Sequence, residues 1–354
     1  LGGCGGGRRG ISQSVSFEAP DPRDPARSLL GLLAGKWIAA AIAAAAELGL
    51  ADVLTARGPL GAAALASELG CDAQGLGRLL DVLVGEGLLA VDERERYSLT
   101  AIGAELRTEA LRDLARYMGA PFAWAPFAHV AAALRQGRSA FELAHGESVF
   151  RYLDTHPAEA DVYQRGIDTF TRREAQALSQ AFDFRATRSL VDVGGGLGTL
   201  LVEVLARFSS LRGVLVDRPA VVAQAERALE YVPERGRIEL YPADFFERLP
   251  AGADVYVLKH VLHNWDDERA VSLLRNCAES MASDGKLIIV DGYLLPGGRR
   301  DATRLLDLEM FVLCGAGRER RKPEFRALLH RARLKLVSSQ ALAGTTCMIV
   351  AEKR

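Results

Sequence analysis

The chain has 354 residues, which is enough for two domains with separate cores. Hydrophobic residues make up 49% and charged residues 25%, as in ordinary globular proteins, and a formal net charge of −1 gives no positive field that would attract nucleic acid or an anionic membrane. The cysteines lack the close spacing of a zinc or redox motif, which fits a reducing cytoplasm. They are Cys4, Cys71, Cys277, Cys314 and Cys347.

The N-terminal segment, residues 1–25, is predicted to be a flexible tail. It opens with the glycine-rich LGGCGGGRRG. The adjacent arginines Arg8 and Arg9 are not directly followed by an apolar segment, so they do not indicate an export signal. The alanine-rich run Trp37–Ala46 is too short to span a bilayer and is bounded by Lys36 and Glu47. We therefore expect no membrane partner and a cytoplasmic location.

Residues 26–106 have the pattern of a winged-helix domain. A helix, a turn and a second helix at about 73–84 precede two short strands at 88–91 and 97–100, which flank a charged turn. The second helix carries one basic residue, Arg78, whereas a DNA-recognition helix needs several polar or basic side chains. The pattern therefore favours packing against a second copy of the chain, as a homodimer, over nucleic-acid binding.

The remaining chain changes from helices to alternating strands and helices. Residues 107–180 predict a helical linker that contributes to an acceptor pocket, and residues 181–354 predict an α/β domain with a parallel sheet covered on both faces. The last segment, LKLVSSQALAGTTCMIVAEK, predicts two strands added antiparallel at the end of the sheet. The parallel strands are expected in SLVDVG, GVLVD, RIELYPAD, ADVYVLKH and KLIIVDGYL.

A glycine-rich loop follows the strand SLVDV and precedes a helix. Glycines there let a ligand approach the backbone at the carboxyl end of a strand, where open α/β sheets bind ligands. Thr199 stands where the dinucleotide fingerprint has Gly or Ala. The loop alone predicts a nucleotide-like site, and a tight turn without ligand is the alternative. Its glycines are Gly194, Gly195, Gly196 and Gly198.

Two acidic residues follow the loop at informative positions. Asp217 ends the next strand, about twenty residues on, where a carboxylate accepts hydrogen bonds from a ribose diol; capping the following helix is its alternative role. Asp244 follows the third strand and can accept the adenine amino group, while Phe245 or Phe246 packs on the base. The combination favours an adenosyl cofactor without phosphates, S-adenosylmethionine, over a nicotinamide dinucleotide.

From VDVGGGLGTL onward the chain resembles the plant and bacterial small-molecule O-methyltransferases that carry an N-terminal winged-helix dimerisation domain. The resemblance implies a Rossmann-like class I methyltransferase domain, a homodimer and S-adenosylmethionine as cofactor. It also implies that Asp217 holds the ribose, Asp244 and Phe245 the adenine, and Lys259 the cofactor near its methionine end. The matching segments are VDVGGG, LVDRPAV, ADFFERLP, VLKHVLHNWDDE, IIVDGYL and GRERRKPEF.

By the same resemblance His263 is the general base, and Asp291 and Glu319 are the carboxylates that orient it. An imidazole near neutral pH can remove the proton of the hydroxyl that is methylated. Related proteins usually have Glu at the position of Asp291, so this contact is expected to be lost or bridged by water. A solvated charge is the alternative for Glu319. His260 lies three residues before the base, but no third ligand is evident nearby, so we expect no metal.

The acceptor pocket is expected to be apolar and aromatic, which suits a flat phenolic or polyketide-like acceptor. Core packing is the alternative for each lining residue. The predicted function is methyl transfer to a hydroxyl; the alternatives are a non-methylating relative that hydroxylates, decarboxylates or closes rings, a winged-helix regulator, and a nicotinamide-dependent oxidoreductase. The candidate acceptor residues are Phe122, Trp124, Phe127, Asn264, Asp307, Met310 and Phe311.

Overall fold

The computed structural model describes residues 23–295, 297, 301–342 and 344–354. Contacts between residues divide the chain into an N-terminal unit that ends at Ala104 and a C-terminal unit from Glu105 to Arg354. Of the tail expected at residues 1–25, residues 1–22 lie outside the described residues.

The N-terminal unit combines helices with a small three-stranded sheet of order β1-β3-β2. Helix α4 (Ala73–Gly85) begins at Asp72, whose side chain accepts a hydrogen bond from the backbone N–H of Gly75. Strands β2 (Leu89–Val91) and β3 (Arg96–Leu99) pair antiparallel. The predicted helix-turn-helix and hairpin are thus confirmed. The other elements are α1 (Pro25–Leu48), α2 (Leu50–Arg57), β1 (Leu60–Gly61) and α3 (Ala62–Leu69).

Helix α1 is longer than the alanine-rich run suggested. It has 24 residues, and by length and composition alone it is apolar enough to cross a membrane. The expectation that the run is too short for a span was therefore wrong, because the helix continues through Lys36 to Pro25. Few of its side chains are buried, and an apolar stripe lies on its surface. The exposed side chains are Leu29, Leu30, Leu32, Leu33 and Trp37.

The C-terminal unit contains a seven-stranded sheet of order β6-β5-β4-β7-β8-β10-β9. The first five strands in this order are parallel, while β10 is antiparallel to both β8 and β9. This is the predicted α/β sheet with its antiparallel addition. The strands are β4 (Ser189–Val193), β5 (Arg212–Asp217), β6 (Ile238–Pro242), β7 (Val255–Lys259), β8 (Lys286–Gly292), β9 (Leu334–Ala341) and β10 (Thr346–Lys353).

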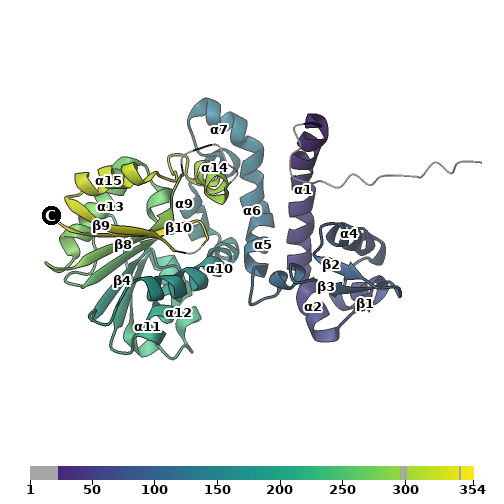
Figure 1. Ribbon diagram of the computed structural model, residues 1–354, viewed down its shortest axis with the longest axis horizontal. Helices are drawn as coiled ribbons and strands as arrows, with labels where there is room; N and C mark the ends of the chain where they lie inside the picture. Colours follow the sequence, from purple (N-terminus) through teal and green to yellow (C-terminus); the bar gives the residue numbers. More distant parts are fainter. Residues whose placement is uncertain (1–22, 296, 298–300, 343) are drawn as a thin grey trace, which may run out of the picture. The chain divides into compact units, whose positions relative to one another are not determined.

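Helices cover both faces of the sheet, with α11 and α12 on one side and α13 and α15 on the other (Figure 1). Each face forms a separate apolar layer, so the central strands are buried on both sides and their sequences are almost continuously apolar. Asp266 caps α13 by accepting a hydrogen bond from the N–H of Arg269. The helices are α11 (Thr199–Arg207), α12 (Pro219–Leu229), α13 (Asp267–Ser280), α14 (Ala302–Cys314) and α15 (Lys322–Arg331).

A run of short helices precedes the sheet and ends in the long helix α10 (Pro157–Ala181). Helix α10 packs on both α5 and α11, which ties this run to the sheet. The other helices of the run are α5 (Arg112–Gly119), α6 (Pro121–Trp124), α7 (Val130–Gln136), α8 (Ala140–His145) and α9 (Val149–Thr155). Short 3₁₀ turns complete the unit: η1 (Gly103–Leu106), η2 (Ala125–His129), η3 (Arg235–Arg237) and η4 (Leu262–Asn264).

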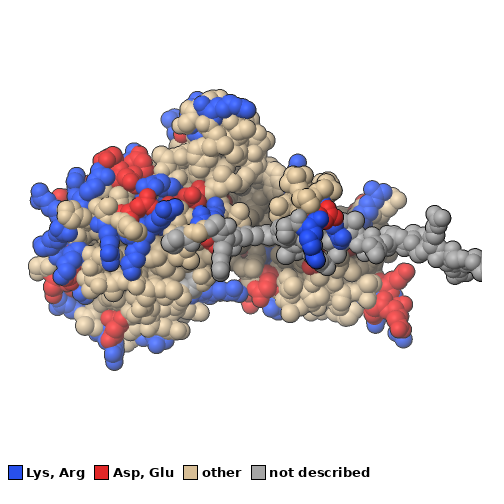
Figure 2. Space-filling view, turned by 45° about the horizontal axis from the view of Figure 1, so that its top comes forward, with Lys and Arg blue, Asp and Glu red and all other residues tan. Residues whose placement is uncertain are grey.

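The surface of the C-terminal unit carries both signs of charge. Figure 2 shows Arg and Lys side chains on its visible face with Asp and Glu side chains among them. Ion pairs of this unit include Arg331 with Glu268 at 2.6 Å and Arg318 with Asp267 at 3.0 Å. Such mixing neutralises the local field of the basic groups.

Candidate active site

The glycine loop turns sharply between β4 and α11. Gly194, Gly196 and Gly198 have φ angles of 75°, 58° and 85°, a left-handed backbone that residues with a side chain rarely adopt. A Cβ atom on Gly194 would lie 2.7 Å from Cγ2 of Val261. The backbone at Gly194 therefore approaches its neighbours too closely for any residue other than glycine.

Asp217 stands at the carboxyl end of β5, beside this loop. Its Oδ2 accepts a hydrogen bond from the Gly196 N–H at 3.0 Å, and its Oδ1 accepts one from the Arg218 N–H at 2.8 Å. Burial raises the pKa of Asp217, and the two backbone donors oppose this effect. Helix α12 has no side-chain cap, so the capping role considered for Asp217 is not the one it performs.

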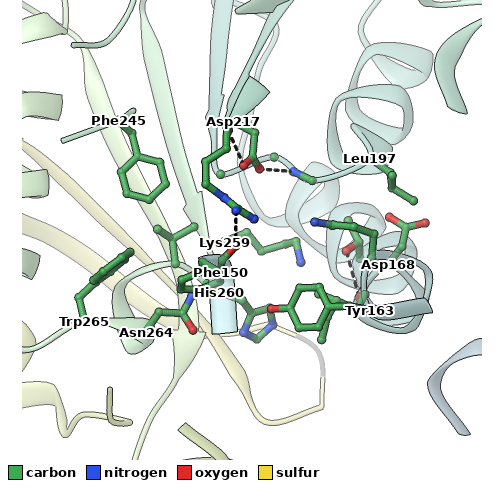
Figure 3. Close-up of a pocket in the computed structure, with 18 of the residues that line it drawn as sticks. Phe150, Tyr163, Asp168, Leu197, Asp217, Phe245, Lys259, His260, Asn264 and Trp265 are labelled. Atoms are coloured by element: carbon green, nitrogen blue, oxygen red, sulfur yellow. Dashed lines mark hydrogen bonds between the residues drawn. The ribbon is translucent and has the colours of Figure 1, made fainter. Parts of the chain in front are cut away.

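A cavity of about 260 Å³ opens at this edge of the sheet. Figure 3 shows Asp217 and Phe245 toward one end and His260, Tyr163 and Asn264 toward the other. Every residue proposed from the sequence for the cofactor lines it. These residues are Gly194, Gly195, Gly196, Asp217, Asp244, Phe245, Phe246 and Lys259.

The end of the cavity near Phe245 is aromatic. The Phe246 ring lies edge-on to Trp265 with centroids 4.8 Å apart, and the Arg269 guanidinium lies 4.2 Å from the centre of the Phe246 ring. Asp244 is exposed, and its Oδ1 accepts a hydrogen bond from the Phe246 N–H at 2.8 Å. A flat base with an exocyclic amino group fits such a set of rings beside a carboxylate.

The sequence prediction missed Glu174 of α10. This buried carboxylate accepts a hydrogen bond from the His260 imidazole at 2.9 Å and lies 3.5 Å from the Lys259 ammonium. Burial opposes its ionisation, but His260 and Lys259 outweigh burial and lower the pKa of Glu174. His260 has a φ of 54°, and its carbonyl accepts a hydrogen bond from the Asn264 side chain at 3.1 Å. Glu174 thus holds the strained segment that leads to His263.

A second acid outside the prediction is Asp192, in the middle of the motif that precedes the glycine loop. It is buried in β4, and its Oδ2 has no hydrogen-bond partner among the described residues. Burial raises the pKa of Asp192 to about 7, although the Lys259 charge opposes this effect. The short apolar run SLVDV predicted the strand but carried no signal that its one acid would be unpaired.

His263 is buried in the η4 turn directly after β7. Its Nδ1 lies 2.7 Å from Oε1 of Glu319, which is 1% exposed, so the carboxylate accepts the imidazole N–H. Glu319 is therefore not a solvated surface charge, which was its alternative role. Burial disfavours the imidazolium, but Asp291 and Glu319 outweigh burial and raise the pKa of His263.

Asp291 lies close to both imidazoles without bonding to either. Its Oδ1 is 3.8 Å from Nδ1 of His263 and 3.8 Å from Nδ1 of His260, and neither carboxylate oxygen has a hydrogen-bond partner among the described residues. The direct contact is absent, as expected for a side chain one methylene shorter than Glu. Burial raises the pKa of Asp291.

The statement that no third ligand lies near the two histidines was wrong. His260, His263 and Asp291 place one ligand atom each within 4.8 Å of one another, a grouping that a metal ion could use. However, each imidazole already has a carboxylate partner: Glu174 for His260 and Glu319 for His263. The two carboxylates account for the orientation of both imidazoles, so no metal ion is needed to explain the arrangement.

The candidate acceptor residues do not form one wall. Phe122 and Met310 share an apolar cluster with Tyr117, whereas Phe311 packs in a different cluster with Val312. Phe127 is 48% exposed. Asn264 lines the cavity, and Trp124 is only partly buried. Asp307 accepts a hydrogen bond from the Glu319 N–H at 2.8 Å and so anchors the segment that carries the partner of His263.

Comparison with known families follows the division of the chain. Residues 127–335 match the O-methyltransferase domain family, and residues 30–109 match the O-methyltransferase dimerisation domain. The chain belongs to the O-methyltransferase family. This assignment sets aside the oxidoreductase and regulator alternatives.

Several proteins similar to this chain are named as methyltransferases of small molecules. The chain is 38% identical to 3-amino-4-hydroxybenzoate 4-O-methyltransferase of Streptomyces cremeus, with 94% of this chain and 92% of that protein aligned. It is 36% identical to the mitomycin biosynthesis 6-O-methyltransferase of Streptomyces lavendulae (91% and 93% aligned). A relative at 31% identity, phenazine-1-carboxylate N-methyltransferase of Pseudomonas aeruginosa (93% and 97% aligned), is named for methylating nitrogen.

Solved structures agree with the class I methyltransferase fold. The O-methyltransferase NcsB1 from neocarzinostatin biosynthesis, in complex with S-adenosylmethionine and 2-hydroxy-5-methyl naphthoic acid, superposes with a TM-score of 0.75 at 30% identity. The match covers 89% of this chain and 95% of that one. The expected fold, a class I methyltransferase domain behind a dimerisation domain, is confirmed.

Proposed function

We propose that this enzyme transfers the methyl group of S-adenosylmethionine to a phenolic hydroxyl of a small aromatic natural product. The observation that carries the proposal is the His263–Glu319 pair, a buried imidazole held at 2.7 Å by a buried carboxylate; Asn264, next to His263 in the chain, lines the cavity. With Nδ1–H donated to Glu319, Nε2 is the nitrogen that can accept the hydroxyl proton.

The chain's residues then have separate tasks in the reaction. His263 removes the proton of the acceptor hydroxyl, so that the oxygen becomes a better nucleophile as attack begins. Glu319 fixes the imidazole tautomer, and Glu319 and Asp291 together stabilise the imidazolium that results. Both carboxyls are almost fully buried, which keeps water from screening their charges.

The cofactor side of the cavity fits S-adenosylmethionine. Bound there, the cofactor would supply an electrophilic methyl group on a sulfonium. Asp217 would accept hydrogen bonds from the ribose diol, while Asp244, Phe245 and Phe246 would hold the adenine. Lys259 would meet the carboxylate of the methionine end. We propose no metal in this chemistry, because proton removal and methyl transfer need none.

The acceptor class and the assembly follow from the same comparison. The aromatic substrates in the names of relatives, an aminohydroxybenzoate and a naphthoic acid, support a phenol with one or two rings. We also propose a homodimer through the dimerisation domain expected at residues 26–106, because all but the first residue of the exposed apolar stripe of α1 lie within the segment that matches the dimerisation domain. Residues 107–180 would supply the acceptor wall, and residues 181–354 would bind the cofactor.

Transfer to nitrogen is the second candidate, because relatives at 31% and 33% identity are named for methylating nitrogen. A screen of phenols and aromatic amines with methyl-labelled S-adenosylmethionine separates the possibilities. O-Methyl products together with S-adenosylhomocysteine are expected. Exclusive N-methylation would replace the proposal with the second candidate. If the enzyme bound the cofactor but hydroxylated or decarboxylated the acceptor without methylating it, the non-methylating alternative would replace the proposal.

A further inference from the structure

Helix α14 carries an acidic residue, Glu309, on the side that packs against the helical run before the sheet. The Tyr117 hydroxyl donates a hydrogen bond to Glu309 Oε1 at 3.3 Å. Tyr117 is 3% exposed, whereas Glu309 is only partly buried. Tyr117 is the one hydrogen-bond partner found for this carboxylate among the described residues.

The position of Glu309 places it on the acceptor side of the site. The Tyr117 ring meets the Tyr163 ring edge-on with centroids 5.4 Å apart, and Tyr163 lines the cofactor cavity. Helix α14 also lies against η4, the turn of His263, and Cys314 at its end approaches the Asn264 side chain at 3.7 Å. Contacts thus lead from Glu309 through Tyr117 to Tyr163 at the cavity, and the helix of Glu309 lies next to the turn that carries His263.

The surroundings of Glu309 leave its charge only partly compensated. Burial raises its pKa, and the Tyr117 hydrogen bond and the His263 charge oppose that effect. Within the described ranges no Lys or Arg forms an ion pair with it. Its partner Tyr117 belongs to an apolar cluster that includes Phe122, Met310 and Leu313. A carboxylate in such a place gains most from a further N–H or O–H donor.

We propose that Glu309 sets acceptor specificity by accepting a hydrogen bond from a second N–H or O–H group on the aromatic ring. This inference rests on the proposed function and names the acceptor class more closely: aminophenols and catechols. A ring with a methyl group in that position would leave the carboxylate unpaired. A ring with a carboxylate there would bring two negative charges together in a region of low dielectric.

A matched pair of acceptors tests this assignment, because amino and methyl groups have nearly the same size. We would measure kcat/KM for 2-aminophenol and 2-methylphenol with the wild type, Glu309→Gln and Glu309→Leu. The wild type is expected to prefer 2-aminophenol by about ten- to a hundredfold, the range for a hydrogen bond to a charged group. Glu309→Leu should reduce that preference to within about threefold, and Glu309→Gln should give an intermediate ratio.

Glu268→Gln makes the same substitution at an exposed acid of α13 and should leave the ratio unchanged. Should the wild type methylate neither probe, calorimetric dissociation constants for the pair, measured on the enzyme bound to S-adenosylhomocysteine, give the same ratio. An equal preference in the wild type and Glu309→Leu, by either measurement, would overturn the assignment. A third outcome separates the two proposals. If no acceptor were methylated but the wild type still bound 2-aminophenol preferentially and Glu309→Leu did not, the proposed function would be rejected and Glu309 would remain a recognition residue.

Discussion

The proposed cofactor side and the proposed acceptor side of this site are built from different kinds of elements. The residues proposed for the cofactor lie at the ends of parallel strands, as Asp217 ends β5 and Asp244 follows β6, so the backbone of the sheet sets their positions. The residues proposed for the acceptor side come from helices that are distant in sequence: Tyr117 of α5 and Glu309 of α14 are 192 residues apart. The sheet therefore constrains one side strongly, while side chains on the helices can vary the other.

His263 stands at the junction of the two sides, and its removal should have the largest effect. His263→Ala should lower kcat by about a thousandfold or more, near the upper range for general acid–base catalysis, because it removes the group proposed to take the hydroxyl proton. Calorimetry should show cofactor affinity within about threefold of wild type. His263→Gln retains more of the buried volume and checks that folding is intact.

The matched control is His129→Ala, which removes an exposed imidazole from the same unit and should leave turnover unchanged. Turnover of His263→Ala at more than a tenth of the wild-type rate would remove His263 from the role of base.

Asp217→Ala tests the cofactor side alone. Loss of a buried carboxylate that meets a diol should weaken cofactor binding by at least about tenfold, the range for charge-assisted hydrogen bonds. Binding of S-adenosylhomocysteine measured by calorimetry reports this directly, and the acceptor KM at saturating cofactor should change little. Asp284→Ala, at an exposed acid, is the control. If acceptor KM rose as much as the cofactor dissociation constant, the two sides would not be separable as described.

Glu319→Gln tests how the base is tuned. Asp291 and Glu319 raise the pKa of His263, and the base must be neutral to accept a proton, so activity should fall as pH drops through this raised pKa. Removing the Glu319 charge lowers the pKa of His263, so the acid limb of the kcat/KM profile should shift to lower pH, by about one unit or less. Maximal kcat should also fall, because the amide holds the imidazole less firmly. An unchanged acid limb would contradict this assignment of the limb to His263.

The same difference between the two sides explains what could be predicted from the sequence. The order of strands and loops was recognisable because apolar runs end in glycines or acids, and every expected cofactor residue lines the cavity. The candidate acceptor residues do not share one cluster, because helical periodicity does not tell which helices meet: Phe311 packs apart from Phe122. The contact between Tyr117 and Glu309 was not predicted, since it joins helices far apart in sequence. Glu174 was missed for the same reason, since its partner His260 lies 86 residues away.

Glu174 links the two sides of the site, because this residue of α10 contacts both Lys259 on the cofactor side and His260 beside the proposed base. Glu174→Gln keeps the shape and removes the charge, so the Lys259 ammonium loses its fixed position. We expect KM for the cofactor to rise about three- to tenfold, as for loss of one partly buried ion pair, with kcat within about threefold. Asp161→Asn, an exposed acid on the same helix, is the control. A larger fall in kcat than rise in cofactor KM would mean that Glu174 acts mainly through His260, and the helix α10 would then belong to the base as much as to the cofactor.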